Sequence, residues 1–152
     1  MGTTPSMPAF REPTAVEKLF NRAFGFLVGL GIAPRDYYLL QVRGRKSGRI
    51  YSTPVNPLER KGKRFRVAPR GRAQWVRNAE SAGVVTLKRG GSRLQFRLRA
   101  LPNQERPEIL KEYLDRFSST VQRYFPVPKG SPPQAFANLA EQYPVFELLP
   151  PE

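Results

Sequence analysis

Short β-type runs separated by glycine-containing turns fill most of this 152-residue chain and limit what it can fold into. The runs are rich in β-branched and aromatic residues or alternate apolar with polar side chains, as strands do. They cover residues 37–42, 50–58, 64–68, 84–88, 94–101 and 144–149. Because short turns join several of them, the pattern predicts antiparallel hairpins that build a small barrel.

Helical patterns flank these strands. Thr14 is the predicted N-cap of a helix whose apolar side chains recur at helical spacing as far as Val28. Shorter helices are predicted at residues 73–79, 102–117 and 134–141. We therefore expect a mainly β protein with flanking helices (α+β), in which a flexible tail over residues 1–13 precedes a single domain over residues 14–152.

The predicted N-terminal helix has two interpretations. Its apolar C-terminal end favours packing on the barrel, and a membrane-surface anchor is the alternative. The apolar run 24–33 is too short to span a bilayer, and its place inside the chain argues against a signal peptide. The sequence has no cysteine for disulfides, which is compatible with a cytoplasmic protein, membrane-associated if the helix is an anchor.

The positive charge is concentrated in the middle of the chain. The formal net charge is +14, and residues 37–100 hold 17 Lys and Arg against two acids, Glu59 and Glu80. Such a field attracts polyanions: nucleic acid, anionic lipid, or a phosphorylated or polycarboxylate cofactor. Charge alone does not choose among them.

The residue types that carry most hydrolytic and metal chemistry are missing. The sequence has no histidine and no cysteine, which excludes thiolate nucleophiles, histidine acid–base catalysis and the usual zinc sites. Ser47, Ser52 and Thr53 have no histidine to activate them. The acids of the basic segment are too sparse for paired-carboxylate hydrolysis or a metal site. We expect a bound organic cofactor to carry the chemistry, without a metal.

The turn at residues 43–49 is the candidate binding site. A tight turn requires glycine, because a residue without Cβ takes positive φ at little cost, but it does not require cations. Bare glycine N–H groups, a hydroxyl and converging cationic side chains suit a phosphate or another polyanion. The candidate residues are Arg43, Arg45, Lys46, Ser47, Gly48 and Arg49. A solvated basic hairpin tip is the alternative.

Several short motifs occur in a set order between Tyr37 and Leu149. They are the turn Gly44-Arg45-Lys46-Ser47-Gly48, the dipeptide Thr53-Pro54, a glycine loop leading to Trp75 and Asn78, the next hairpin, and the ending Pro144-Val145-Phe146-Glu147-Leu148. This ordered set resembles the deazaflavin-dependent nitroreductase family, whose members are split β-barrels that bind coenzyme F420. The resemblance implies an FMN-binding-like split β-barrel with F420 as its cofactor, and FMN is the alternative cofactor.

The resemblance also implies roles for individual residues. Those expected to face the cofactor phosphate are Arg45, Lys46, Ser47 and Arg49. Those expected along the ring, at the ring edge or at the acidic tail are Thr53, Pro54, Arg70, Gly71 and Arg72. Trp75 and Asn78 would set the helix after the loop in place. By residue type alone a core anchor is the more common role for Trp75, and a local cap is the alternative for Asn78. Tyr124, with Tyr113 behind it, would supply a substrate-pocket hydroxyl.

The expected reaction is hydride delivery from reduced F420 to a quinone, a nitro-compound or an activated alkene, with a tyrosine or water supplying the proton. The alternative class is a nucleic-acid-binding barrel whose exposed aromatics would stack on bases. The candidates for stacking are Tyr37, Tyr38, Tyr51 and Phe65. Alternation along the strands would bury some of these rings, which disfavours nucleic acid. Because split barrels of this kind often pair, a homodimer is also expected.

Overall fold

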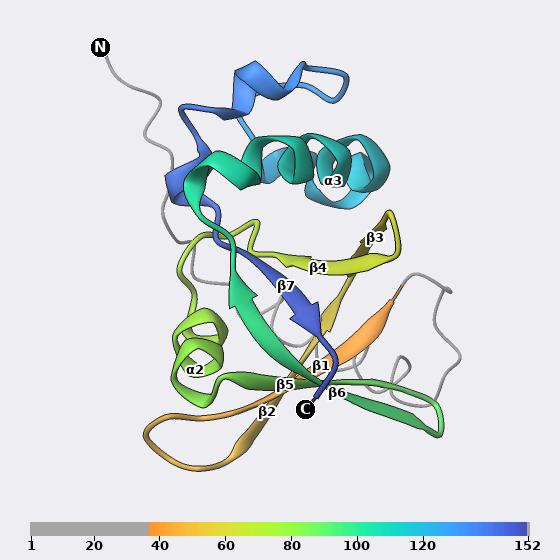
Figure 1. The fold of residues 1–152 in the computed structure, drawn as a ribbon, viewed down its shortest axis with the longest axis vertical. Helices are drawn as coiled ribbons and strands as arrows, with labels where there is room; N and C mark the ends of the chain where they lie inside the picture. Colours follow the sequence, from red (N-terminus) through yellow and green to blue (C-terminus); the bar gives the residue numbers. More distant parts are fainter. Residues whose placement is uncertain (1–36, 152) are drawn as a thin grey trace.

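The computed structural model describes residues 37–151, in which seven strands form one sheet and two helices pack against it (Figure 1). The strands are β1 (Tyr38–Arg43), β2 (Ile50–Val55), β3 (Leu58–Arg60), β4 (Lys63–Val67), β5 (Val84–Arg89), β6 (Ser92–Ala100) and β7 (Val145–Leu149). The helices are α2 (Gln74–Ala82) and α3 (Arg106–Val121), and short 3-10 helices cover Asn103–Glu105, Gln122–Tyr124, Pro133–Phe136 and Ala140–Gln142. The predicted tail and N-terminal helix lie outside the described residues, and the single-domain boundary stays a prediction.

The strand order forces the sheet to curl. The order is β2-β1-β5-β6-β7-β4-β3, so β2 and β3 form the two edges although only Asn56 and Pro57 separate them in the chain. Three Cα–Cα steps span at most about 11 Å. Seven strands laid flat would hold their edge strands roughly 29 Å apart. The sheet therefore rolls until its edges approach at this corner, and the predicted split β-barrel with flanking helices is confirmed.

This corner also divides the run predicted at 50–58 into two strands. Pro57 has no N–H to donate to a ladder, so pairing stops beside it. On the far side of the corner, Lys61 and Gly62 both have positive φ, 52° and 78°, and Arg60 pairs with Lys63. These are the dihedral signs of a two-residue type I′ hairpin, which suits the twist of β3 and β4.

Two apolar clusters fill the fold. One lies within the curled sheet, under α2, and its buried members are Leu40, Val42, Val55, Ala79, Val85, Leu87 and Leu148. The other lies between α3 and the β3–β4 hairpin and includes the helical stripe expected from the sequence, Leu110, Tyr113, Leu114 and Phe117. Each large apolar side chain buried in this way contributes roughly 2 kcal/mol. The clusters dock α2 on β1 and β5, and α3 on β4, as Figure 1 shows.

The chain after residue 117 differs from the sequence pattern at two places. The predicted helix end coincides with a kink at Phe117, after which α3 continues to Val121. The helix predicted at 134–141 is instead a pair of 3-10 turns. The backbone hydrogen bonds there join residues three apart, such as Ala137 N–H to Gln134 O and Leu139 N–H to Phe136 O, which is the 3-10 pattern. Phe136 and Ala140 are buried in the cluster beside α3, so packing overrides helix propensity in this segment.

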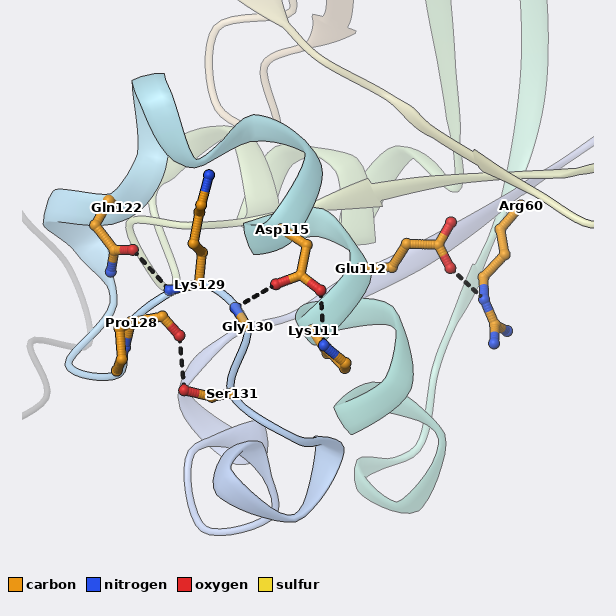
Figure 2. Close-up of polar contacts among 9 residues, drawn as sticks. All are labelled: Arg60, Lys111, Glu112, Asp115, Gln122, Pro128, Lys129, Gly130 and Ser131. Atoms are coloured by element: carbon orange, nitrogen blue, oxygen red, sulfur yellow. Dashed lines mark hydrogen bonds and ion pairs between the residues drawn. The ribbon is translucent and has the colours of Figure 1, made fainter.

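Side chains of α3 and of the turn after it hold the proline-containing loop that follows Tyr124 (Figure 2). Asp115 Oδ1 accepts the Gly130 N–H at 2.7 Å, and Gln122 Oε1 accepts the Lys129 N–H at 3.0 Å. The loop is therefore fixed to the helical layer, together with the residues that lead into it. Within residues 37–151, no helix has the length and apolar character needed to cross a bilayer.

Candidate functional site

The turn between β1 and β2 is closed by its own backbone. Gly44 donates its N–H to Arg49 O at 2.7 Å, and Gly48, with φ +75°, donates to Gly44 O at 3.0 Å. The expectation that these glycines bare their N–H groups for a ligand is therefore wrong, because the turn itself uses both. Within the described residues, the backbone amides of Lys46 and Ser47 make no recorded hydrogen bond.

Side chains brace the same turn. Arg43 Nη1 donates to Gly48 O at 2.8 Å, so this arginine supports the turn backbone. Ser47 Oγ accepts the Arg49 N–H at 3.1 Å and lies 3.2 Å from the Tyr51 hydroxyl. The Tyr51 ring passes so close to Gly44 that a Cβ there would lie 2.6 Å from its Cε2 atom. Glycine at position 44 is thus favoured by a neighbouring side chain, whereas the positive φ in this turn belongs to Gly48.

Arg45 and Asn78, two predicted site residues 33 positions apart, meet between this turn and α2. Asn78 Oδ1 accepts both the backbone N–H of Arg45, at 3.1 Å, and its Nη1, at 2.8 Å. Gln74, one turn earlier on α2, accepts from the same Nη1 at 3.0 Å. Asn78 is only 6% exposed, so α2 presents a fixed acceptor to the turn. The alternative in which Asn78 is only a local cap is therefore wrong, because its acceptor bonds a residue 33 positions away.

The other two cations of the turn project from its exposed tip. The side chains of Lys46 and Arg49 are exposed, and neither has an ion pair recorded in the part of the chain that is described. Together with Arg45 they form a set of three cations, none of which forms an ion pair with a carboxylate within residues 37–151. Such a donor set fits a phosphate group, which prefers several uncompensated N–H donors.

Thr53 and Pro54 lie half-buried on β2, the edge strand that follows the turn. They pair with Leu40 and Leu39 of β1. Because successive strand residues point to opposite faces, the two side chains cannot both lie against one face of a ring. The β1 partner of Thr53, Leu40, belongs to the inner cluster, so Thr53 points into the half-barrel. Which of the two meets a cofactor ring stays a prediction.

Arg70 and Tyr124, the predicted loop cation and the predicted hydroxyl, are in direct contact. The Tyr124 hydroxyl oxygen lies 3.2 Å from Arg70 Nε and 3.0 Å from its Nη2. Arg123 donates to the same oxygen at 2.8 Å, and both guanidinium groups lie over the ring, at 5.3 and 4.9 Å from its centre. Gly71 adopts φ +80°, which lets the chain turn sharply between Arg70 and α2.

Arg72 and Trp75 play different parts. Arg72 forms an ion pair with Glu80 of α2 at 2.7 Å, so a carboxylate already compensates its charge. Trp75 is half-buried with its edge toward Phe146, 6.1 Å between ring centres, and with the Arg66 guanidinium over its face. Both contacts are those of a core anchor for the loop and helix.

Tyr113 belongs to the apolar cluster against which Tyr124 packs, and it is out of solvent. It is 2% exposed, and burial raises the pKa of its hydroxyl while the neighbouring Arg66 opposes that shift. A proton transfer from Tyr113 to a substrate is therefore disfavoured, and Tyr124 is the better placed of the two hydroxyls. No group of three or more potential metal ligands occurs among residues 37–151, as far as histidine, cysteine and acids are concerned.

Sequence reasoning missed several of these residues. Gln74 lies four positions before Asn78, so a helix places both on one face, and this spacing was an available signal. Arg123 was detectable only as a neighbour of Tyr124. Arg66 lies in a run that alternates charged with apolar residues, a pattern that predicts a solvent-facing side chain, yet Arg66 is only 6% exposed. Tyr51, first considered for base stacking, instead supports the turn through Ser47.

Known proteins match this chain in sequence and in fold. The model of one family, described as F420H(2)-dependent quinone reductase, matches residues 13–126. A solved domain-swapped dimer is 20% identical with a TM-score of 0.54, over 89% of this chain and 99% of its own. The F420-H2 Dependent Reductase FDR-A is 21% identical with a TM-score of 0.51, over 75% and 94%.

A NimC/NimA family protein from Clostridium acetobutylicum is 16% identical with a TM-score of 0.51, over 84% of this chain and 77% of its own. At these identities the structural likenesses show the fold alone. No curated protein matches this sequence.

Proposed function

The chain belongs to the F420H(2)-dependent quinone reductase family, and we propose that it delivers a hydride from reduced F420 to a quinone, and also to nitro-compounds and activated alkenes. The family is one of oxidoreductases, and its cofactor is F420H2; FMN is a minor alternative. The quinone is the acceptor that the family description states, and the other two acceptors extend it on chemical grounds.

The observation that carries the proposal is the set of cations at the β1–β2 turn. Arg45 is held by amide oxygens, and Lys46 and Arg49 have no ion pair recorded within the described chain. A phosphate there would meet uncompensated charge from three side chains and the Ser47 hydroxyl.

Each part of the site then has a task. When bound, the reduced deazaflavin supplies the hydride. The β1–β2 turn binds its phosphate, and α2 fixes the distance between that turn and the loop at 69–73. The Tyr124 oxygen already accepts hydrogen bonds from Arg70 and Arg123, so its own hydrogen is left for donation. We assign Tyr124 as the proton donor to the acceptor oxygen, with water restoring its proton.

A titration of purified protein with F420 tests the proposal. Cofactor fluorescence is followed at low and moderate salt, beside FMN and a single-stranded oligonucleotide. We expect F420 to bind and the other two to bind much more weakly, and replacing Arg45 and Lys46 with alanine to weaken F420 binding and flatten its salt dependence. Preferential binding of the oligonucleotide, lost in salt, would overturn the proposal in favour of a nucleic-acid-binding barrel.

Tyr124→Phe distinguishes the loss of the proton donor from a loss of cofactor binding. The ring and its packing against two guanidinium groups remain, and only the hydroxyl is lost. Turnover of a soluble quinone should fall about 100-fold, within the range for removal of a general acid, while the F420 dissociation constant stays the same. Tyr38→Phe, which removes a hydroxyl elsewhere on the sheet, is the control.

A homodimer is part of the proposal. One solved structure of this fold is a domain-swapped dimer, which supports pairing of split barrels. Sedimentation velocity over a range of protein concentrations tests it, and a single monomer boundary throughout would contradict it.

A further inference from the structure

Two arginines next to α2 are held by chemically different partners. Glu80 accepts two hydrogen bonds from Arg72, at 3.2 and 2.7 Å, and its carboxylate compensates the arginine charge. Arg45 is held just as closely, but by the amide oxygens of Gln74 and Asn78 at 3.0 and 2.8 Å. An amide oxygen fixes a guanidinium without cancelling its charge.

We propose that Gln74 and Asn78 are positioning residues that orient Arg45 toward an anionic group of the cofactor while leaving its charge uncompensated. The inference rests on the proposed function for the identity of that group, a phosphate ester. It adds a role for Gln74, and it gives Asn78 a role in controlling the charge of Arg45.

The atoms used by the two amides support this role. Both amide oxygens accept from Nη1, whose two hydrogens are thereby used. Arg45 Nε and Nη2 make no recorded hydrogen bond within residues 37–151. Those two nitrogens form the edge of a guanidinium that grips a phosphate through two parallel hydrogen bonds. The two amide oxygens of Gln74 and Asn78, called the clamp below, therefore hold one side of the Arg45 guanidinium. The other edge, which suits a phosphate, stays available.

The clamp also fixes the backbone. Asn78 Oδ1 accepts the Arg45 N–H at 3.1 Å, so one buried acceptor sets both the main chain and the side chain of this residue. An arginine side chain that is ordered in advance loses less conformational freedom when a ligand binds. Gln74 is exposed and Asn78 is buried, so the two can be replaced with different risks to folding.

The decisive variants exchange each amide for a carboxylate of the same shape. Asn78→Asp and Gln74→Glu keep an acceptor next to Arg45 but compensate its charge. We expect each to weaken F420 binding at least about tenfold and to make its salt dependence shallower, with the midpoint of thermal unfolding retained. Gln134→Glu makes the same chemical change beside α3, far from the turn, and should leave F420 binding as it is.

Inorganic phosphate provides a readout that does not need F420. We expect it to raise the thermal unfolding midpoint of the natural protein and of Gln134→Glu, but not of Asn78→Asp or Gln74→Glu. Equal stabilisation or equal F420 affinity in all four proteins would overturn the inference. Failure of the natural protein to bind F420, with the phosphate response intact and lost in the two variants, would instead refute the proposed function and keep the clamp.

Discussion

The Arg66 guanidinium lies over the face of Trp75, 4.5 Å from the ring centre, and is 6% exposed. Its Nη1 donates to the Val67 carbonyl, and its Nε has no hydrogen-bond partner among the residues described. Burial lowers the pKa of Arg66, and Tyr113 beside it opposes that shift. A cation without a carboxylate thus joins β4, α2 and α3 through an aromatic face, a carbonyl and a phenol.

Replacing Arg66 tests whether this junction depends on packing or on charge. Arg66→Ala leaves a cavity under Trp75 and should lower the free energy of unfolding by about 3 kcal/mol. Arg66→Met fills the space with an apolar chain suited to an aromatic face and should cost only about 1 kcal/mol. Trp75 is the only tryptophan, so its fluorescence during urea unfolding reports directly on the site. Equal losses in both variants would mean that the guanidinium contacts dominate.

Gly44→Ala should disturb the β1–β2 turn through Tyr51. The new Cβ would lie 2.6 Å from a Tyr51 ring atom, so the exposed ring must swing away and lose its contact with Ser47. We expect a loss of about 1 kcal/mol, measured by urea unfolding. In a Tyr51→Ala background the same substitution should cost much less, because the obstacle is gone. Additive effects would show that backbone conformation, not the ring, excludes alanine.

Lys61→Asn should stabilise the protein. Lys61 has φ 52°, a left-handed conformation that asparagine adopts more readily, and Asn-Gly is the favoured pair for this type I′ turn. The expected gain in the free energy of unfolding is about 0.5 kcal/mol. Lys63→Asn removes the same charge from a residue within β4 and should give no gain. A gain in both variants would point to relief of charge repulsion instead.

Acid should loosen the loop that follows Tyr124. Hydrogen bonds from Lys111 and from the Gly130 N–H hold the pKa of Asp115 below its ordinary 3.8. Because the folded-state pKa lies below the unfolded one, this stabilisation is complete above the unfolded value and disappears as the pH falls through the folded one. The stability difference between the natural protein and Asp115→Asn should be constant near neutrality and shrink below pH 3.8. A difference that is the same at every pH would contradict this.

The curled sheet was predictable from short-range pattern, whereas its edges were not. Glycine-containing turns and the alternation of apolar with polar residues predict hairpins, and all six predicted β-type runs lie in the sheet. The corner at Asn56–Pro57 depends on pairing between strands far apart in sequence, and no local preference encodes which strands become neighbours.

The candidate site was predictable as a set of residues but not as a set of partners. The basic turn, Asn78, Arg70 and Tyr124 all stand out by residue type. Arg45 bonds to an amide and Arg72 to a carboxylate because of how α2 docks. The residue types alone do not predict this difference. The burial of Arg66 was concealed because an arginine in an alternating strand normally faces water.

The place of β7 has a consequence for the order of folding. This strand lies between β6 and β4, and without it the sheet separates into a β2-β1-β5-β6 part and a β4-β3 part joined by the Asn56–Pro57 link. The strand that joins the two parts is therefore the last of these seven to leave the ribosome. Until they arrive, β4 and β6 each present an unpaired edge, so the nascent chain must avoid association through those edges before the half-barrel can form.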